Sequence, residues 1–193
     1  MKCITRLAVS GASVLFLAGC TGGDSGYDYE IPQSLCDVKV AASNIKPLLP
    51  PGKEVVVDQS ESTLRPGAGR SCSVTVDKRP DLTVSISRQG GEVDIAREAS
   101  DKYIDLRQVS LGKGVTSAAV GEDGAVAWMV CVPKPGQPQY ESPKDRVGRY
   151  GHLALEMRIG KDVERSVPVK EWRTHVENLL RSFVPGLVED WCK

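Results

Sequence analysis

Alternating apolar and polar residues predict several β-strands in the middle of the chain. Residues 71–77 and 82–87 each carry an apolar residue at every second position, and the Lys78-Arg79-Pro80-Asp81 stretch between them has the composition of a turn. This pattern is typical of a hairpin with one buried and one polar face. Cys72 falls on the buried face.

Other segments extend this sheet. Residues 150–159 alternate as regularly as the hairpin, and residues 54–58 predict a shorter strand. Residues 125–132 are apolar throughout, which is typical of a central strand that is buried on both faces. A short strand is also expected within 115–120.

Helical spacing of apolar residues predicts three helices, over residues 33–49, 92–108 and 167–184. Pro185-Gly186 is expected to end the last of them. Helices and runs of strands without regular alternation indicate an α+β fold. We expect a mainly antiparallel sheet of about five strands with three helices, in a single globular domain over residues 32–193.

The first 19 residues have the pattern of an export signal. Lys2 and Arg6 provide positive charge, and the apolar stretch that follows, residues 7–18, is 12 residues long. Because a membrane-spanning helix needs about 20 residues, this stretch is interpreted as the core of a signal peptide. Residues 21–31 are rich in Gly, Ser and Asp and predict a flexible tether.

The signal sequence ends in Leu17-Ala18-Gly19-Cys20, which resembles the lipobox of bacterial lipoprotein precursors at all four positions. The resemblance implies that residues 1–19 are removed and that Cys20, then the N-terminal residue, carries a diacylglyceryl group with fatty acyl chains such as palmitate. Two or more such chains give stable anchoring. The protein would then be held on the outer side of the cell membrane. The alternative is an ordinary secreted protein whose signal peptide happens to contain a cysteine.

Four cysteines remain in the expected domain: Cys36, Cys72, Cys131 and Cys192. An exported chain meets an oxidising environment, where disulfides persist. Three pairings of four cysteines are possible. We favour Cys36–Cys72, because the first helix must pack on the side of the sheet to which Cys72 points, and this leaves Cys131–Cys192. The wide spacings and the lack of a Cys-x-x-Cys motif argue against a zinc or redox site.

The charge balance gives no reason to expect binding to nucleic acid. The whole chain has 25 basic and 25 acidic residues, and removal of Lys2 and Arg6 leaves 23 against 25, a net charge of −2. Nucleic-acid binding requires a clear basic excess. The sequence also lacks the phosphate-binding loop, the dinucleotide-binding turn and the metal-binding motifs that would indicate a cofactor, so no cofactor or metal is expected.

The two histidines do not suggest a catalytic pair. His152 and Glu156 lie four residues apart on one predicted strand, about 13 Å at ~3.3 Å per residue, which is too far for direct proton exchange. We interpret them as part of a solvated sheet face, and His175 as the flank of a helix. Trp128 and Trp172 are interpreted as core residues.

One long loop stands out between two predicted strands. Residues 133–149 contain four prolines, two glycines and several charges. Because loops longer than about 12–15 residues are often functional, we predict that this one binds a partner. Tyr140 would provide an aromatic contact, and Arg146 and Arg149 would provide charge.

A looser resemblance concerns the beginning of the folded part. Pro32-Gln33-Ser34-Leu35-Cys36, followed by Cys72-Ser73-Val74 and Leu82-Thr83-Val84, looks like uncharacterised actinobacterial cell-surface lipoproteins. In that group an early Leu-Cys helix is bridged to a cysteine in an early strand. The resemblance covers about residues 31–110 and implies fold and location only.

Together these patterns predict a membrane-anchored, extracytoplasmic lipoprotein with a non-enzymatic binding or accessory role in the cell envelope. Its expected partners are the membrane, through the lipid on Cys20, and an envelope protein or small ligand. One alternative is a small extracytoplasmic hydrolase whose site is assembled from scattered residues. Another is a purely structural envelope protein. No catalytic residue is assigned.

Overall fold

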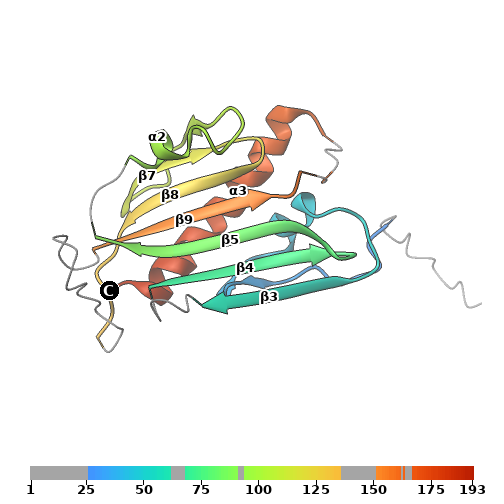
Figure 1. The fold of residues 1–193 in the computed structure, drawn as a ribbon, viewed down its shortest axis with the longest axis horizontal. Coiled ribbons are helices and arrows are strands. Elements are labelled where there is room, and N and C mark those ends of the chain that lie inside the picture. The colour runs from blue at the N-terminus through green and yellow to red at the C-terminus, as the bar shows by residue number, and fades with distance from the viewer. Residues whose placement is uncertain (1–25, 62–67, 91–93, 136–150, 162, 164–166) are drawn as a thin grey trace, which may run out of the picture.

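A single antiparallel sheet of seven strands organises the protein (Figure 1). The computed structural model describes residues 26–61, 68–90, 94–135, 151–161, 163 and 167–193. In spatial order the strands are β3 (Val55–Glu61), β4 (Gly69–Val76), β5 (Arg79–Gln89), β9 (His152–Ile159), β8 (Gly124–Val130), β7 (Val115–Val120) and β6 (Arg107–Gln108). The expected α+β class with a mainly antiparallel sheet and three α-helices is confirmed. The expected number of about five strands is too low.

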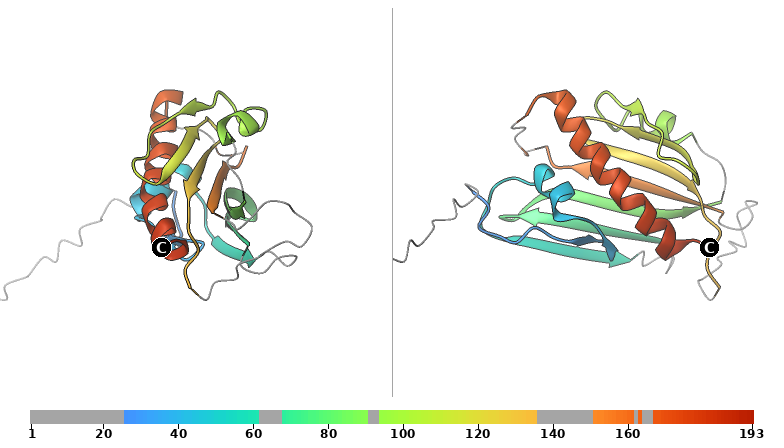
Figure 2. Two further views of the ribbon diagram at one scale, coloured as in Figure 1. Left: turned by 90° about the vertical axis from the view of Figure 1, so that its left-hand side faces the viewer. Right: turned by 180° about the vertical axis from the view of Figure 1, so that it is seen from behind.

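The long helix α3 (Val169–Trp191) crosses one face of the sheet diagonally (Figure 2). Its apolar stripe is buried against the apolar side chains that β4, β5, β9 and β8 direct to this face. The buried helix residues are Trp172, Val176, Leu179, Leu180, Phe183, Val184, Leu187 and Trp191. Burial of this stripe, at about 1.5–3 kcal/mol for each large side chain, fixes the helix on the sheet.

The end of α3 differs from the expectation. Pro185 lies inside the helix, which continues to Trp191. A proline in a helix removes one backbone hydrogen bond and usually bends or ends it. Here Leu187 is fully buried and Trp191 is 8% exposed. Their burial favours continuation of the helix beyond Pro185.

The predicted first helix over residues 33–49 is wrong. The segment forms two short paired strands, β1 (Ser34–Leu35) and β2 (Val38–Lys39), then α1 (Ala42–Ile45) and the 3-10 helix η1 (Lys46–Leu48). Cys36 and Asp37, between the two strands, have positive φ angles of 49° and 66°. A right-handed helix cannot contain such residues. The segment packs beside α3 on the same face of the sheet.

The predicted second helix over residues 92–108 is also wrong. Only α2 (Ile95–Ala99) is helical, capped by Asp94, whose side chain accepts a hydrogen bond from the Arg97 amide. Asp105 has a positive φ of 46°, and the chain then enters β6. The segment bends because Ala99 and Tyr103 are buried against β7, β8 and β9, which a straight helix could not achieve.

Both favoured disulfides are present. Cys36–Cys72 joins the β1–β2 turn to β4, and Cys131–Cys192 joins the residue after β8 to the residue after α3. Each bridge therefore attaches to the sheet an element that packs on its α3 side. None of the helices in the described ranges is long and apolar enough to cross a membrane.

Candidate binding surface

The two faces of β4 and β5 have opposite chemistry. The side chains directed to α3 are apolar except for Arg70 and Arg88, which lie near Trp191 at one end. Those on the other side are hydroxyl residues: Ser71, Ser73, Thr75, Thr83, Ser85 and Ser87. We call these six residues the hydroxyl face. The strand register places Ser71 opposite Ser85 and Ser73 opposite Thr83. The Ser71 and Ser85 hydroxyl oxygens lie 3.2 Å apart, within hydrogen-bond distance.

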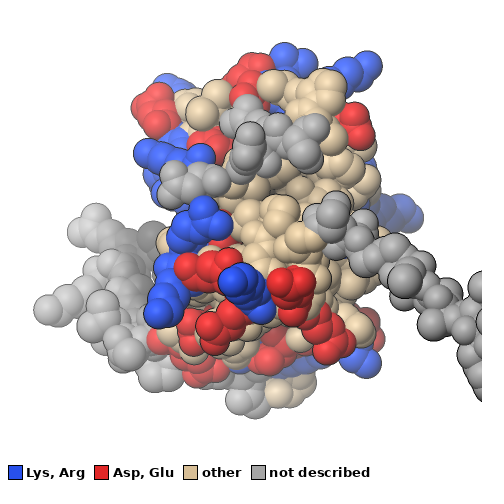
Figure 3. Space-filling view, turned by 90° about the vertical axis from the view of Figure 1, so that its right-hand side faces the viewer, with Lys and Arg blue, Asp and Glu red and all other residues tan. Residues whose placement is uncertain are grey.

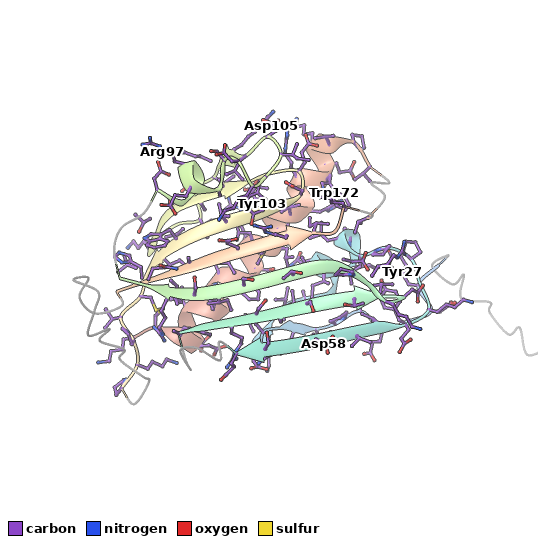
Figure 4. The ribbon with its side chains drawn as sticks, in the orientation of Figure 1. Tyr27, Asp58, Arg97, Tyr103, Asp105 and Trp172 are labelled. Carbon is purple, nitrogen blue, oxygen red and sulfur yellow. A yellow bond between two sulfur atoms is a disulfide. The ribbon has the colours of Figure 1, made fainter. Side chains whose placement is uncertain are left out.

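Charged residues border the hydroxyl face on both sides. On β9, Glu156 lies opposite Ser85 and Arg158 lies opposite Thr83, and their charged groups are 3.7 Å apart. On β3, Asp58 lies opposite Ser73 (Figure 4). The surface thus offers hydroxyl donors and acceptors in rows, with an ion pair along one border and an exposed carboxylate along the other.

The segment over residues 94–111 covers only half of this side of the sheet (Figure 1). It packs on β7, β8 and β9, where Tyr103 is 6% exposed. The guanidinium carbon of Arg158 lies 5.5 Å from the centre of the Tyr103 ring. Burial, with a smaller contribution from Glu156, raises the pKa of Tyr103 to about 12, although Arg158 opposes the shift. Tyr103 and Arg158 thus form the boundary between the covered half and the hydroxyl face.

Trp128 and His152 stack beneath the covered half. Their ring centres are 5.4 Å apart and the ring planes make an angle of 23°. Trp128 is 2% exposed, which agrees with its interpretation as a core residue, and Trp172 is equally buried. The Trp172 indole donates a hydrogen bond to the carbonyl oxygen of Glu122. Both tryptophans therefore serve packing and lie outside the hydroxyl face.

The histidines form no acid–base pair with a carboxylate among the described residues. His152 contacts Trp128 and has a buried Nδ1 that lacks a hydrogen-bond partner in this part of the chain. His175 lies half-buried on α3. Proton transfer requires a partner at hydrogen-bond distance, and the described residues provide none for either ring.

Asp105 of the segment over residues 94–111 and Glu122 next to it take part in ion pairs. Asp105 pairs with Arg107 and with Arg173, and Arg173 also pairs with Glu122 at 2.9 Å. The hydrogen bonds from Arg107 and then Arg173 hold the pKa of Asp105 below its usual value. This network joins the covering segment to α3. Across the ranges with assigned structure, no group of three His, Cys, Asp or Glu residues is arranged to hold a metal ion.

The site residues predicted from the long loop and the lipobox lie outside the described residues. These are Tyr140, Arg146 and Arg149 in the loop and Cys20 at the expected anchor. The strand ends that flank the loop can nevertheless be placed. Val130 and His152 pair with each other at one end of the sheet. Tyr27, near the start of the described chain, bridges to Gly52 at the opposite end.

The sequence predicts only part of the hydroxyl face. The alternation over residues 71–77 and 82–87 correctly predicts a polar face on the hairpin. It does not show that the neighbouring strands are covered by the segment over residues 94–111, because that segment was expected to be a helix. Tyr103 and Arg158 mark the limit of the hydroxyl face, and this limit is seen only in the structure.

Comparison with known proteins gives no match: no family model fits the sequence, and no curated protein or solved structure is significantly similar to it.

Proposed function

We propose that this chain is an exported lipoprotein, anchored through Cys20 on the outer side of the cell membrane. Its folded domain acts as a non-enzymatic binding or accessory module of the cell envelope. The observation that carries the proposal is the short distance in sequence between the lipobox cysteine and a folded domain with two disulfides. Gly26 already accepts a backbone hydrogen bond from Gly52, so only the five residues 21–25 lie between this first contact and Cys20.

The disulfides favour an oxidising compartment. Cys36–Cys72 and Cys131–Cys192 use all four cysteines of the expected domain, and such structural bridges are rare in proteins of the reducing cytosol. This agrees with the signal peptide that the sequence predicts. Cys20 is thereby left as the single cysteine of the processed chain without a disulfide partner in the domain, which suits its proposed lipidation.

The connection between the anchor and the domain is short. Tyr27 and Tyr29, which the composition assigns to the tether, pack on the domain: their hydroxyl groups donate hydrogen bonds to the carbonyl oxygens of Leu49 and Pro50. The six steps from Cys20 to Gly26 span at most about 20 Å in extended chain. Basic and acidic side chains are interspersed on the end of the domain where the chain enters (Figure 3). That end therefore has no field of one sign, and attachment depends on the lipid.

The hydroxyl face supports the binding role. It presents regularly spaced hydrogen-bonding groups on a rigid sheet, and the described residues leave it uncovered. Hydroxyl groups on a sheet can recognise a ligand through many weak contacts, and they need neither a metal nor an ionised nucleophile. We place the ligand of the module, another envelope component, on this surface.

The anchor is tested by mass spectrometry of the chain recovered from the membranes of a producing bacterium. We expect an N-terminal residue at Cys20 that carries a diacylglyceryl group, and loss of membrane association in a Cys20→Ala variant. An unprocessed N-terminus, or a Cys20→Ala variant that stays in the membrane fraction, would contradict the lipoprotein proposal.

The binding surface is tested by crosslinking and recovery of the chain from intact cells. Ser73→Lys places a long charged side chain in the middle of the hydroxyl face, and we expect it to remove crosslinked envelope components. Asn178→Lys makes the same kind of change on the exposed side of α3 and serves as the control. If both variants recover the same components as the original chain, the hydroxyl face is not the binding surface.

A further inference from the structure

Strand β3 forms one edge of the seven-stranded sheet, and no described residue pairs with its outer side (Figures 1 and 2). Val56 is 41% exposed and Val57 is 44% exposed. An unprotected edge strand is a template for pairing with another strand, and proteins usually protect it with a proline, a central lysine or a bulge. Strand β3 contains no proline, lysine or bulge, and its charged residues are Asp58 and Glu61.

The pairing of β3 with β4 shows which backbone groups of β3 point outward. The Asp77 amide donates to the carbonyl oxygen of Glu54 at 3.0 Å, so Glu54 directs its backbone groups toward β4. In an antiparallel pair, alternate residues direct both backbone groups to the same side. Val55, Val57 and Gln59 therefore direct their N–H and C=O groups outward, away from the sheet.

We propose that β3 pairs with β3 of a second copy of this chain, antiparallel and around a twofold axis at Val57. This register places Val55 opposite Gln59 of the partner subunit and forms six backbone hydrogen bonds over residues 55–59. It also brings Lys53, in the bend two residues before β3, near Glu61 of the partner subunit, twice by symmetry. Within its own copy Glu61 pairs with Arg70 at 2.9 Å, so a partner lysine would add a second cation to this carboxylate. The two sheets become one continuous sheet of fourteen strands, twice the seven strands of one copy.

Charge complementarity selects both the partner and the register. Two neighbouring registers also place the outward-facing backbone groups of the two copies opposite each other. Their twofold axes lie at Val56 and at Asp58. The first places Glu54 opposite Asp58 of the partner subunit, and the second places Asp58 opposite Asp58 of the partner subunit. Like charges directly opposite each other destabilise a strand pair. Only the register centred on Val57 pairs unlike charges and avoids like ones.

The pairing is expected to be weak in dilute solution. One strand on each side gives an interface smaller than the 1,200–2,000 Å² of stable complexes. Confinement of both copies to one membrane would raise their effective concentration and strengthen the pairing. The proposal itself rests on β3 and holds whether or not the chain is lipidated.

The first experiment uses zero-length carbodiimide crosslinking of the full chain in detergent, with ¹⁴N-labelled and ¹⁵N-labelled chains mixed. Lys53, two residues before β3, and Glu61, the last residue of β3, are eight residues apart, about 26 Å at ~3.3 Å per residue, so a zero-length reagent cannot join them within one chain. We expect a crosslink between Lys53 and Glu61 that combines the two isotopes. Self-association without this crosslink, or a monomer at every concentration by light scattering, would overturn the proposal.

Proline provides the second test. Val57→Pro removes an outward N–H group and leaves the β3–β4 hydrogen bonds intact, because Val57 faces away from β4. We expect the dimer dissociation constant to rise at least about tenfold, a change of ~1.4 kcal/mol. Val57→Ala keeps the N–H group and should have a smaller effect. If the Val57→Pro dimer is as strong as the original, the interface lies elsewhere.

A charge exchange provides the third test and does not depend on proline. Lys53→Glu and Glu61→Lys should each weaken the dimer, and the double variant should restore it, because the opposite charges face each other again. Lys170→Glu, on the exposed first turn of α3, is the matched control and should have no effect. Failure of the double variant to recover association would contradict the proposed register.

Discussion

The buried guanidinium group of Arg88 holds Trp191 in place. It donates a hydrogen bond of 3.1 Å to the carbonyl oxygen of Trp191, and its carbon atom lies 5.2 Å from the centre of the indole ring. Arg88 is 4% exposed, at the end of β5, and Trp191 is the last residue of α3. A charged side chain from the sheet thus fixes the final turn of the covering helix.

Arg88→Met should therefore destabilise the protein by about 2–3 kcal/mol, because the Trp191 carbonyl loses a charged donor in a buried position. Arg88→Lys keeps the charge without the planar group and should lose less. Urea unfolding with the disulfides intact measures both. Buried ionic groups can sometimes be replaced by apolar residues without loss; an Arg88→Met variant as stable as the original would place Arg88 in that class.

Each disulfide should contribute about 4 kcal/mol. The bridges close loops with sequence separations of 36 and 61 residues, and loop-closure entropy gives a slightly larger contribution to the longer loop. The paired variants Cys36→Ala/Cys72→Ala and Cys131→Ala/Cys192→Ala should show this loss in urea unfolding. A loss below about 1 kcal/mol for either pair would mean that the entropic account fails for that bridge.

Asp77 should make stability depend on pH in the acid range. Its carboxylate accepts hydrogen bonds from the backbone amides of Lys53 and Glu54, and these bonds lower the pKa of Asp77 from the usual value of 3.8. A carboxyl whose pKa is lower in the folded state stabilises the fold above its unfolded pKa, and the effect disappears as pH falls through the folded pKa.

The measurement compares the urea midpoints of the original chain and an Asp77→Asn variant. The original should be more stable at pH 7, and the difference should narrow as the pH falls below 3.8. Asparagine keeps an acceptor oxygen and tolerates the positive φ of 47° at this position, so the variant isolates the charge. A difference that stays constant through the acid range would exclude this role.

Gly124 should not tolerate a side chain. A Cβ atom at this position would lie 2.0 Å from the carbonyl oxygen of Met157 and 2.6 Å from Cε1 of Tyr103. We expect Gly124→Ala to cost more than about 3 kcal/mol, since backbone on one side and a buried ring on the other must both move.

Gly112→Ala is the control for Gly124→Ala. Gly112 has a positive φ of 94° but no atom within 4 Å of the added Cβ, so only backbone strain of about 1–2 kcal/mol is expected. Thermal unfolding compares the two variants. Equal losses would show that backbone strain, and not the close contact with β9, dominates at Gly124.

Local periodicity was sufficient for most of the sheet. Residues 71–77, 82–87 and 150–159 alternate because one face of each strand packs on α3, and residues 125–132 are apolar because β8 is covered on both faces. The pairing of Cys36 with Cys72 is confirmed, although it was inferred from a first helix that is wrong; the correct part of the inference is that this segment packs on the side of the sheet to which Cys72 points. The strands are predictable because burial of one or both faces produces a regular pattern of apolar residues in the sequence.

The parts that were predicted wrongly depend on single backbone conformations or on distant packing. The residues around Cys36 and Asp37 have helical spacing, but two positive φ angles turn them into a hairpin. Pro185 usually ends a helix, and here the burial of Leu187 outweighs it. The hydroxyl face is likewise invisible to periodicity, because its exposure depends on where the segment over residues 94–111 packs.

The order of elements along the chain also bears on when the domain can fold. Helix α3 follows every strand in the sequence, yet it supplies the apolar stripe that seals one face of the sheet. Until those residues emerge from the ribosome, only the short segment over residues 34–49 is present to cover that face of the sheet. Burial of this face is therefore completed only when the last helix has been synthesised, and we expect the native domain to form only at that stage.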